Sequence, residues 1–184
     1  MVNFCLDEKE RSLLKSLVGK RLLEVKHDPF DKFGGATVYG RVELFFEDII
    51  VLIGYDYSPY PLFGSEDDDR PKFSLKAIGE EGAISALQDV EQVYESYNEI
   101  IEGVTLVEDA VKAEWSNKKD EVRTLIAILF KLPSCELGIQ GDYMIPLLDL
   151  FRGEDLKKRL ARPGEEFEND PETKFEAQRF YMDL

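Results

Sequence analysis

Apolar residues recur at helical spacing near the start of the chain. A helix is predicted over Asp7–Val18, and the apolar residues that fall largely on one of its faces are Leu6, Leu13, Leu14, Leu17 and Val18. Acidic residues occupy its first turn, where they offset the positive end of the helix dipole. Gly19 follows its last turn and can take the left-handed conformation that ends a helix. The pattern therefore predicts an amphipathic first helix.

Strand-like patterns follow, in which apolar and polar residues alternate or apolar residues form short runs. They cover Arg21–Lys26, Ala36–Phe46, Ile49–Tyr57 and Lys72–Ile78. The run from Ile49 to Ile53 is apolar throughout, which is typical of a central strand. A second helix is predicted over Ala83–Ile101, where Ile84, Leu87, Val90, Tyr94, Tyr97 and Ile101 recur at helical spacing.

Three further strands are predicted after Gly103, over Val104–Trp115, Glu121–Leu132 and Cys135–Gln140. The polar segment 117–120 supplies the turn between the first two. In the tail, Leu147–Leu160 is predicted as a helix interrupted at Gly153, and Lys174–Met182 as a short closing helix. The segment Arg162–Glu172 is acidic and bracketed by prolines, so we expect a loop there.

The order helix, glycine, strand, strand, strand occurs twice in this prediction. Gly19–Val25 aligns with Gly103–Asp109, and Ile53–Tyr57 aligns with Ile139–Tyr143, at offsets of about 85 residues that favour a duplication. The alternative is that any protein with a helix and a meander of strands aligns with itself this well. We predict an α+β fold in which antiparallel sheets pack with helices. The single compact domain spans residues 1–184, with candidate repeat units at 6–78 and 83–146 and a helical, acidic tail at 147–184.

Composition adds a partner class to this picture. The chain has 184 residues, of which 43% are hydrophobic and 33% charged, as in folded proteins. Its 38 acids and 23 Lys and Arg residues give a net charge of −15. Such a surface repels nucleic-acid phosphates and anionic membranes, so neither is expected as a partner. It attracts basic proteins and opposes self-association, so we expect a monomer, or at most a weak dimer, when the protein is free. The alternative is that the acidity only maintains solubility.

The location of the protein is predicted from its ends and its cysteines. Acidic residues stand near the N-terminus where a secretory signal would be apolar. The longest apolar run, Thr124–Phe130, is too short to span a membrane. Cys5 and Cys135 lie in dissimilar settings, which favours two free thiols in a reducing compartment and leaves a single disulfide open. We therefore expect a cytoplasmic protein.

Residues suited to catalysis are sparse. His27 is the one histidine, and it enters a loop at His27-Asp28-Pro29, a common place for an exposed histidine. No local signature pairs it with Cys5 or Cys135. Carboxylates are numerous enough to leave a glycosidase-type pair open, but Glu43 and Glu47 are expected on a solvent face. We expect no catalytic residues and a protein that is not an enzyme.

Cofactor and metal sites are not expected either. One histidine and two separate cysteines supply too few ligands for a zinc cluster. The run Ser65–Asp69 offers oxygen ligands but lacks the spacing of an EF-hand loop. Gly34-Gly35 precedes a predicted strand, whereas a phosphate-binding loop leads into a helix.

Aromatic and acidic residues are concentrated between positions 55 and 69. The predicted partner-binding residues are Tyr55, Asp56, Tyr57, Tyr60, Glu66, Asp67, Asp68 and Asp69. Tyrosine offers rigid contact area with a polar tip and is enriched at binding hot spots. The acids would pair with Arg and Lys of a basic partner. The alternative is that these aromatic residues cover the end of the core. The acidic segment Glu165–Asp170 is the second candidate.

In overall character the chain resembles the bacterial immunity proteins that neutralise toxins of contact-dependent and other polymorphic systems. The shared features are size, acidity, the lack of a catalytic constellation and an aromatic–acidic loop, so no functional residue is carried over. The resemblance implies a protein that binds a cognate toxin domain, basic and nuclease-like, and blocks its active site. Two other classes stay open. A non-catalytic adaptor or scaffold subunit would expose more apolar surface, and a small-ligand-binding protein or enzyme would have a deep pocket lined by Tyr and carboxylates.

Overall fold

Helix α1 (Glu8–Lys15) forms where the sequence predicts the first helix, so that prediction is confirmed. The side chain of Asp7 accepts a hydrogen bond from the backbone N–H of Glu10 (2.8 Å), and the Glu10 side chain accepts one from the N–H of Asp7 (2.9 Å). This capping box satisfies donors that a first turn otherwise leaves without a helical partner. Gly19 follows the helix with a φ of +85°.

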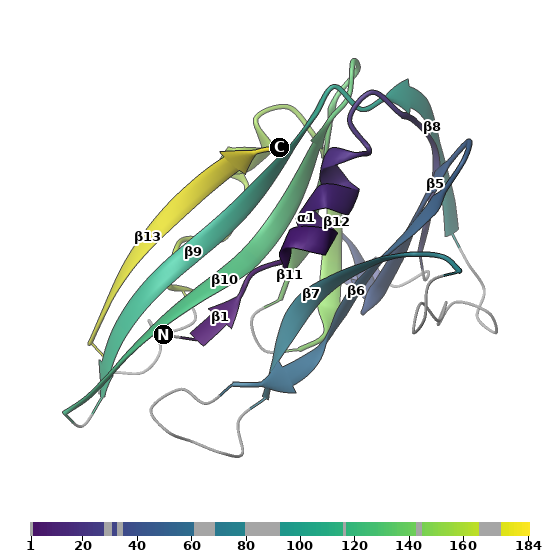
Figure 1. Cartoon of the computed structure of the whole chain (residues 1–184). Helices are drawn as coiled ribbons and strands as arrows, with labels where there is room; N and C mark the ends of the chain where they lie inside the picture. The colour runs from purple at the N-terminus through teal and green to yellow at the C-terminus, as the bar shows by residue number, and fades with distance from the viewer. Residues whose placement is uncertain are drawn as a thin grey trace.

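Most of the remaining chain is extended and forms two sheets (Figure 1). The computed structural model describes residues 2–27, 31–32, 35–60, 69–79, 93–115, 117–142, 145–165 and 174–184, with the backbone alone between 31 and 39. Sheet A has eight strands and sheet B has five. Except for β1, which runs parallel to β10, the paired strands are antiparallel.

The strands of sheet A lie in the order β13-β9-β10-β11-β12-β4-β3. Their bounds are β13 Lys174–Asp183, β9 Gly103–Trp115, β10 Lys118–Lys131, β11 Glu136–Gly141, β12 Leu147–Gly153, β4 Gly35–Tyr39 and β3 Asp31–Lys32. Strand β1 (Val2–Phe4) pairs with β10 at Val122–Thr124, the stretch that β11 leaves uncovered. A short 3-10 helix, η2 (Leu156–Lys158), follows β12.

The strands of sheet B lie in the order β7-β6-β5-β2-β8. Their bounds are β7 Asp69–Ala77, β6 Ile50–Pro59, β5 Arg41–Phe46, β2 Arg21–His27 and β8 Val93–Ile100. The strand predicted over Ala36–Phe46 is two strands, because the chain passes from β4 in sheet A to β5 in sheet B. Gly40 lies between them with a φ of +75°, a conformation that glycine adopts without steric cost.

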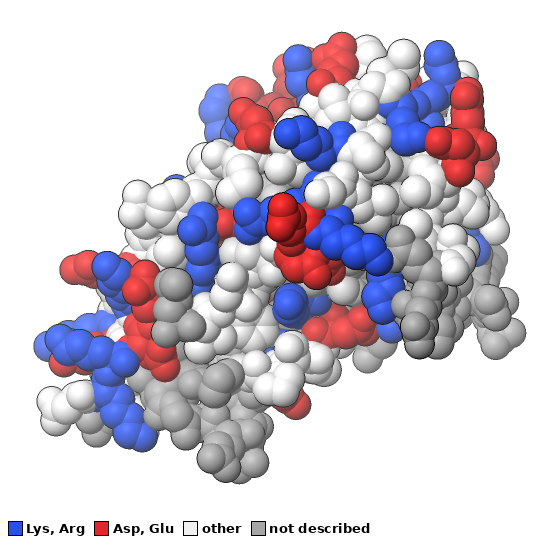
Figure 2. All heavy atoms as spheres, viewed as in Figure 1, with Lys and Arg blue, Asp and Glu red and all other residues white. Residues whose placement is uncertain are grey.

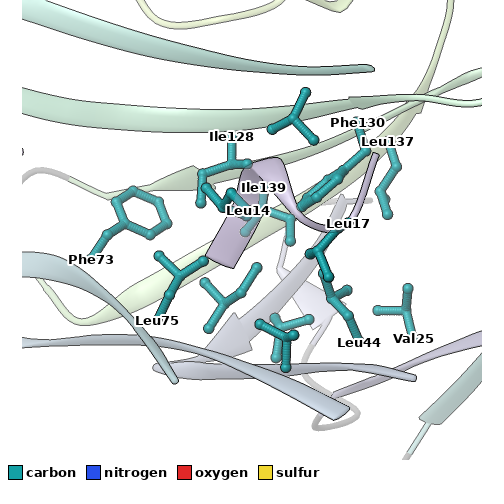
Figure 3. Packing of buried hydrophobic residues seen from close by; sticks show 14 of the residues in the cluster. Leu14, Leu17, Val25, Leu44, Phe73, Leu75, Ile128, Phe130, Leu137 and Ile139 are labelled. Carbon is teal, nitrogen blue, oxygen red and sulfur yellow. The ribbon is translucent and has the colours of Figure 1, made fainter. Parts of the chain in front are cut away.

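The main hydrophobic core is shared by α1 and both sheets. Figure 3 shows Leu14 and Leu17 of the α1 region among side chains from sheet A, such as Ile128, and from sheet B, such as Leu44. All four are fully buried. Glu10 also ties the helix to sheet B, because its Oε1 accepts a hydrogen bond from the N–H of Leu75 in β7 (3.0 Å).

The predicted α+β class, with helices packed on sheets, is wrong. In the part of the chain that the structure describes, α1 is the only α-helix and strands make up most of the residues. The predicted helix at 83–101 is strand β8 over Val93–Ile100, and its first half, 83–92, lies outside the described residues. The predicted helix at 147–160 is β12 followed by η2, and the closing helix at 174–182 is β13.

The two segments β8 and β13 were assigned to helices for the same physical reason. Within the described part of the chain, each is an edge strand with a pairing partner on one side only. Half-buried and exposed side chains alternate along β8, and none of its residues is fully buried. Its apolar residues are few and widely spaced, and they match a helical spacing as well as a half-exposed strand. Pairing with a strand that is remote in sequence decides between helix and strand. That partner is β2 for β8 and β9 for β13.

The predicted duplication of a helix–strand–strand–strand unit is also wrong. Gly103 is the first residue of β9 and does not end a helix, since β8 precedes it. Two aligned residues, Tyr55 and Gly141, nevertheless meet in space. A Cβ atom on Gly141 would lie 2.2 Å from Cζ of Tyr55, so glycine is required where the tyrosine ring crosses β11.

Candidate protein-binding surface

The aromatic residues predicted to bind a partner divide into buried and exposed ones. Tyr55 is buried in β6, its ring centroid lies 4.7 Å from that of Phe73, and its hydroxyl donates a hydrogen bond to the carbonyl oxygen of Asp142 (2.7 Å). Tyr60 is also buried, and its ring lies 5.1 Å from that of Phe4. These two tyrosines cover the end of the core, as in the alternative interpretation of this segment, in which its aromatic residues pack against the core and do not bind a partner.

Tyr57 is the exposed member of the predicted set. It has 53% of its surface accessible and lies opposite Pro71 near the end of the β6–β7 pair. Side chains two residues apart in a strand share a face, so Tyr57 continues the face of Tyr55 beyond the end of the core. An exposed aromatic side chain on a rigid strand has the character of a binding anchor.

Acidic residues lie beside Tyr57. Asp56 is exposed and forms an ion pair with Arg41 (3.1 Å), and Asp69 is exposed opposite Pro59. The predicted acids Glu66, Asp67 and Asp68 lie outside the described residues, as does most of the second candidate, Glu165–Asp170. Of the predicted site, Tyr57 and Asp69 are therefore exposed on one face of the β6–β7 pair, and Asp56 is exposed on the other face.

The negative charge is unevenly distributed along the chain. Three segments contain several acids and no Lys or Arg, namely residues 66–69, 80–91 and 165–172. Figure 2 shows basic and acidic side chains intermingled on the face that it presents.

His27 is buried, contrary to the exposed loop position expected for it. Its Nε2 lies 3.7 Å from Oε1 of Glu95, and Oε2 of Glu95 accepts a hydrogen bond from the Tyr97 hydroxyl (2.9 Å). Burial, with the negative charge of Glu95 beside it, raises the pKa of Tyr97. Glu95 and Tyr97 line a cleft of about 120 Å³ with Arg152 and apolar residues. A cleft of this size has room for a few water molecules.

A larger open hollow, of about 650 Å³, lies where β9, β10 and β13 run together. Its charged lining residues are Lys112, Glu114, Lys119, Asp120, Glu121, Lys174 and Glu176. Lys119 and Glu114 form an ion pair across it (3.2 Å). The hollow is shallow and of mixed charge, unlike the Tyr-lined deep pocket that a small-ligand protein would need.

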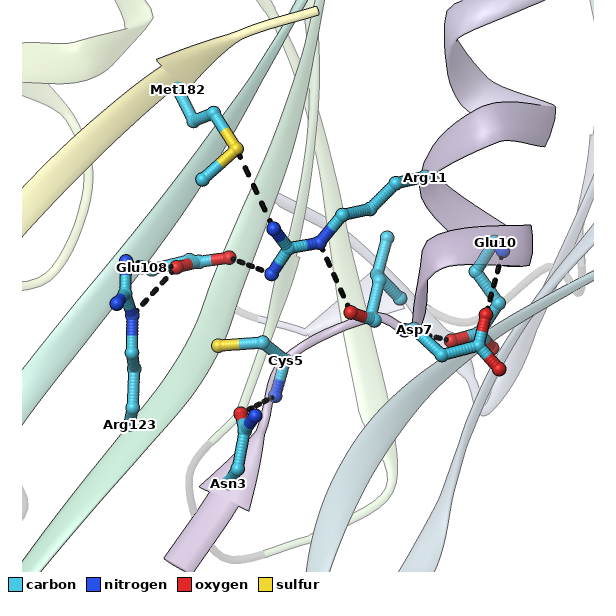
Figure 4. A network of polar contacts seen from close by, with 9 residues as sticks. Asn3, Cys5, Asp7, Glu10, Arg11, Glu108, Arg123 and Met182 are labelled. Carbon is cyan, nitrogen blue, oxygen red and sulfur yellow. Dashed lines mark hydrogen bonds and ion pairs between the residues drawn. The ribbon is translucent and has the colours of Figure 1, made fainter. Parts of the chain in front are cut away.

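A buried charged network, which the sequence pattern did not reveal, joins α1 to sheet A (Figure 4). Glu108 of β9 accepts hydrogen bonds from Arg11 of α1 (3.1 Å) and Arg123 of β10 (2.8 Å). Arg11 also donates to the sulfur of Met182 in β13 (3.7 Å). Cys5 lies beside Glu108, and burial, reinforced by the carboxylate charge, raises the pKa of its thiol to about 12. Both Cys5 and Cys135 are free thiols.

Among the described residues, no group of three or more His, Cys, Asp and Glu side chains is arranged to hold a metal ion. No helix in the same residues is both long and apolar enough to cross a membrane. Comparison of the chain with protein-family models, with curated proteins and with solved structures found no match.

Proposed function

We propose that the protein acts by binding another protein, and that its partner is a basic toxin-like domain that it inhibits, as an immunity protein does. The observation that supports this function most directly is the exposed Tyr57, which shares one face of the β6–β7 pair with the exposed Asp69, on a chain with a net charge of −15. Tyr57 has the exposure of an anchor, and the acids beside it suit a partner rich in Lys and Arg.

The buried tyrosines have a supporting role in this proposal. Tyr55 and Tyr60 fix the end of β6 against sheet A and β1, so the strand that presents Tyr57 is held in place before binding. Little conformational entropy is then lost when a partner covers Tyr57. An anchor of this kind typically contributes about 2 kcal/mol or more to affinity.

The acids have a different role from the aromatic anchor. Solvated charges at the rim of an interface add little to affinity. They raise the rate of encounter with an oppositely charged partner, by roughly ten- to a thousandfold in strongly charged systems. The unbalanced negative charge of the chain therefore favours rapid capture of a basic domain, and Tyr57 favours its retention.

The experiment measures binding kinetics with a purified basic toxin domain encoded beside the gene for this chain. Replacing Glu66, Asp67, Asp68 and Asp69 with Ser should slow association and flatten its salt dependence, with dissociation nearly unchanged. Tyr57→Ala should mainly speed dissociation. Tyr57→Phe is the matched control, since it keeps the ring and should dissociate at nearly the wild-type rate.

Two results would count against the proposal in different ways. If the domain binds and both sets of variants bind like wild type, the binding site is elsewhere on the chain, and Glu165–Asp170 is the next segment to replace. If no basic domain encoded nearby binds or is inhibited, the proposed function itself is wrong.

A further inference from the structure

The free edges of sheet B are protected against pairing with another strand. On β7, the outward N–H of Leu75 is taken by Glu10 of α1 (3.0 Å), and Pro71 has no N–H to offer. On β8, Asn98 has a φ of 55° and the register with β2 shifts, so this edge is bulged. Proline, capping side chains and bulges are features by which natural proteins prevent edge-to-edge association.

Strand β13, at one end of sheet A, has neither a proline nor a bulge along its described residues. It pairs with β9 along all ten of its residues without a register shift. It contains neither proline nor glycine, and no residue in it has a positive φ. No strand in the described part of the chain lies on its other side, and Figure 1 shows it as the long outer strand of the sheet.

The hydrogen bonding at the end of β13 shows which backbone groups point outward. The N–H of Leu184 donates to the carbonyl oxygen of Val104 (2.9 Å), one step beyond the β13–β9 register. In an antiparallel pair, successive residues alternate between bonding toward the partner strand and pointing away from it. The backbone of Met182 therefore bonds to β9, and the backbone groups of Ala177, Tyr181 and Asp183 point away from it.

We propose that β13 pairs antiparallel with β13 of a second copy of this chain, so that the two copies of sheet A become one continuous sheet. The strand carries two basic residues, Lys174 and Arg179, and two acidic ones, Glu176 and Asp183, so its own charge balances. Two-fold pairing centred on Gln178 opposes Gln178 to its own copy and places Lys174 against the second copy's Met182. In that register Glu176 meets the second copy's Phe180, and no like charges lie directly opposite each other.

The charge of the whole chain sets the conditions for this pairing. Two bodies of net charge −15 repel each other at low ionic strength. The screening length falls from about 10 Å at about 0.1 M salt to about 3 Å at about 1 M. Pairing between two copies is therefore favoured by salt. Binding of a basic partner to the same edge would instead become weaker as the salt concentration rises, because salt weakens attraction between unlike charges.

Sedimentation velocity of the full chain at both salt concentrations tests the proposal. We expect the dissociation constant of the dimer to be at least roughly tenfold lower in about 1 M salt than in about 0.1 M. Tyr181→Pro removes an outward N–H while leaving the bonds to β9, and should weaken the dimer by roughly tenfold or more. Tyr181→Ala is the matched control, because it removes the same ring but keeps the N–H, and should weaken the dimer much less.

Amide hydrogen exchange on the wild-type chain gives a readout that needs no variant. The amides of Ala177 and Tyr181 should gain protection in high salt, whereas that of Met182 should be protected in both conditions. A monomer at both salt concentrations, a dimer that Tyr181→Pro does not weaken, or outward amides that gain no protection would each overturn the proposal. None of these results bears on the proposed binding of a toxin domain, which concerns the far end of β6.

Discussion

Glu108 and Asp109 are consecutive residues of β9, both are buried, and they point to opposite faces of sheet A. Glu108 is held by two arginines, Arg11 and Arg123, whose side chains are 32% and 39% exposed. Asp109 accepts two hydrogen bonds of 2.7 Å from Arg179, and the Arg179 side chain is only 10% exposed.

The difference indicates that the energetic cost of neutralising a buried carboxylate depends on whether its arginine partner can reach water. If Glu108 loses its charge, both arginines can turn toward water. If Asp109 loses its charge, Arg179 remains in a site with little access to water. An uncompensated buried charge costs more than an exposed one, because it has lost its hydration. Asp109 is therefore expected to be the more sensitive position, although Glu108 has more partners.

The largest effect is expected from Asp109→Asn. It leaves the Arg179 guanidinium without its bidentate carboxylate partner, and should lower the free energy of unfolding by about 3–5 kcal/mol, as breaking a buried pair does. Urea denaturation followed by circular dichroism measures this change. The double variant Asp109→Leu with Arg179→Met should recover much of the loss, because apolar residues of similar volume can replace a buried pair.

A smaller loss is expected from Glu108→Gln. The amide keeps one acceptor for the arginines, and both arginines reach solvent, so the free energy of unfolding should fall by about 1–3 kcal/mol. Combining Glu108→Gln with Arg11→Met and, separately, with Arg123→Met in double-mutant cycles shows which arginine contributes more. The expectation that Asp109 is the more sensitive position is wrong if Glu108→Gln destabilises the protein more than Asp109→Asn does.

At neutral pH the smallest effect on stability concerns Cys5, which lies on the Glu108 face. Burial and the Glu108 charge raise the pKa of the Cys5 thiol from an ordinary 9.0 to about 12. Between pH 9.0 and about 12, the Cys5 thiol therefore keeps its proton in the folded chain and loses it in the unfolded chain. The stability tied to this thiol is fully present below pH 9.0 and is lost as the pH rises toward about 12.

Thiol alkylation at alkaline pH gives a measurable difference between the two faces. Glu108→Gln removes a negative charge beside Cys5, so the pKa of the thiol should fall and the alkylation rate should rise. Asp109→Asn, on the other face, should leave the rate unchanged at pH values where the variant is folded. The Cys5→Ala variant shows how much of the alkylation comes from Cys135. Equal rates in both charge variants would show that Glu108 does not act on the thiol.

The sequence could predict those parts of the fold that depend on neighbours in the chain. The Asp7–Glu10 capping box and the leucines of α1 are signals within one helix. The strands β6 and β10 carry continuous apolar runs, and apolar and polar residues are interspersed along β2 and β9. The candidate surface was predicted only in part. Tyr55 and Tyr57 look alike in the sequence, and contact with Asp142 and Phe73 buries only the first.

The sequence by itself determined the first helix, most of the central strands and the excess of negative charge, because each depends on local spacing or on counting. The tertiary structure alone decided the state of β8 and β13, the passage of the chain between sheets at Gly40, and the pairing of Glu108 with arginines from two other elements. These features depend on contacts between residues far apart in the chain. An edge strand or a buried ion pair is stabilised by groups that no local pattern contains, so its free energy becomes favourable only after the sheets have formed.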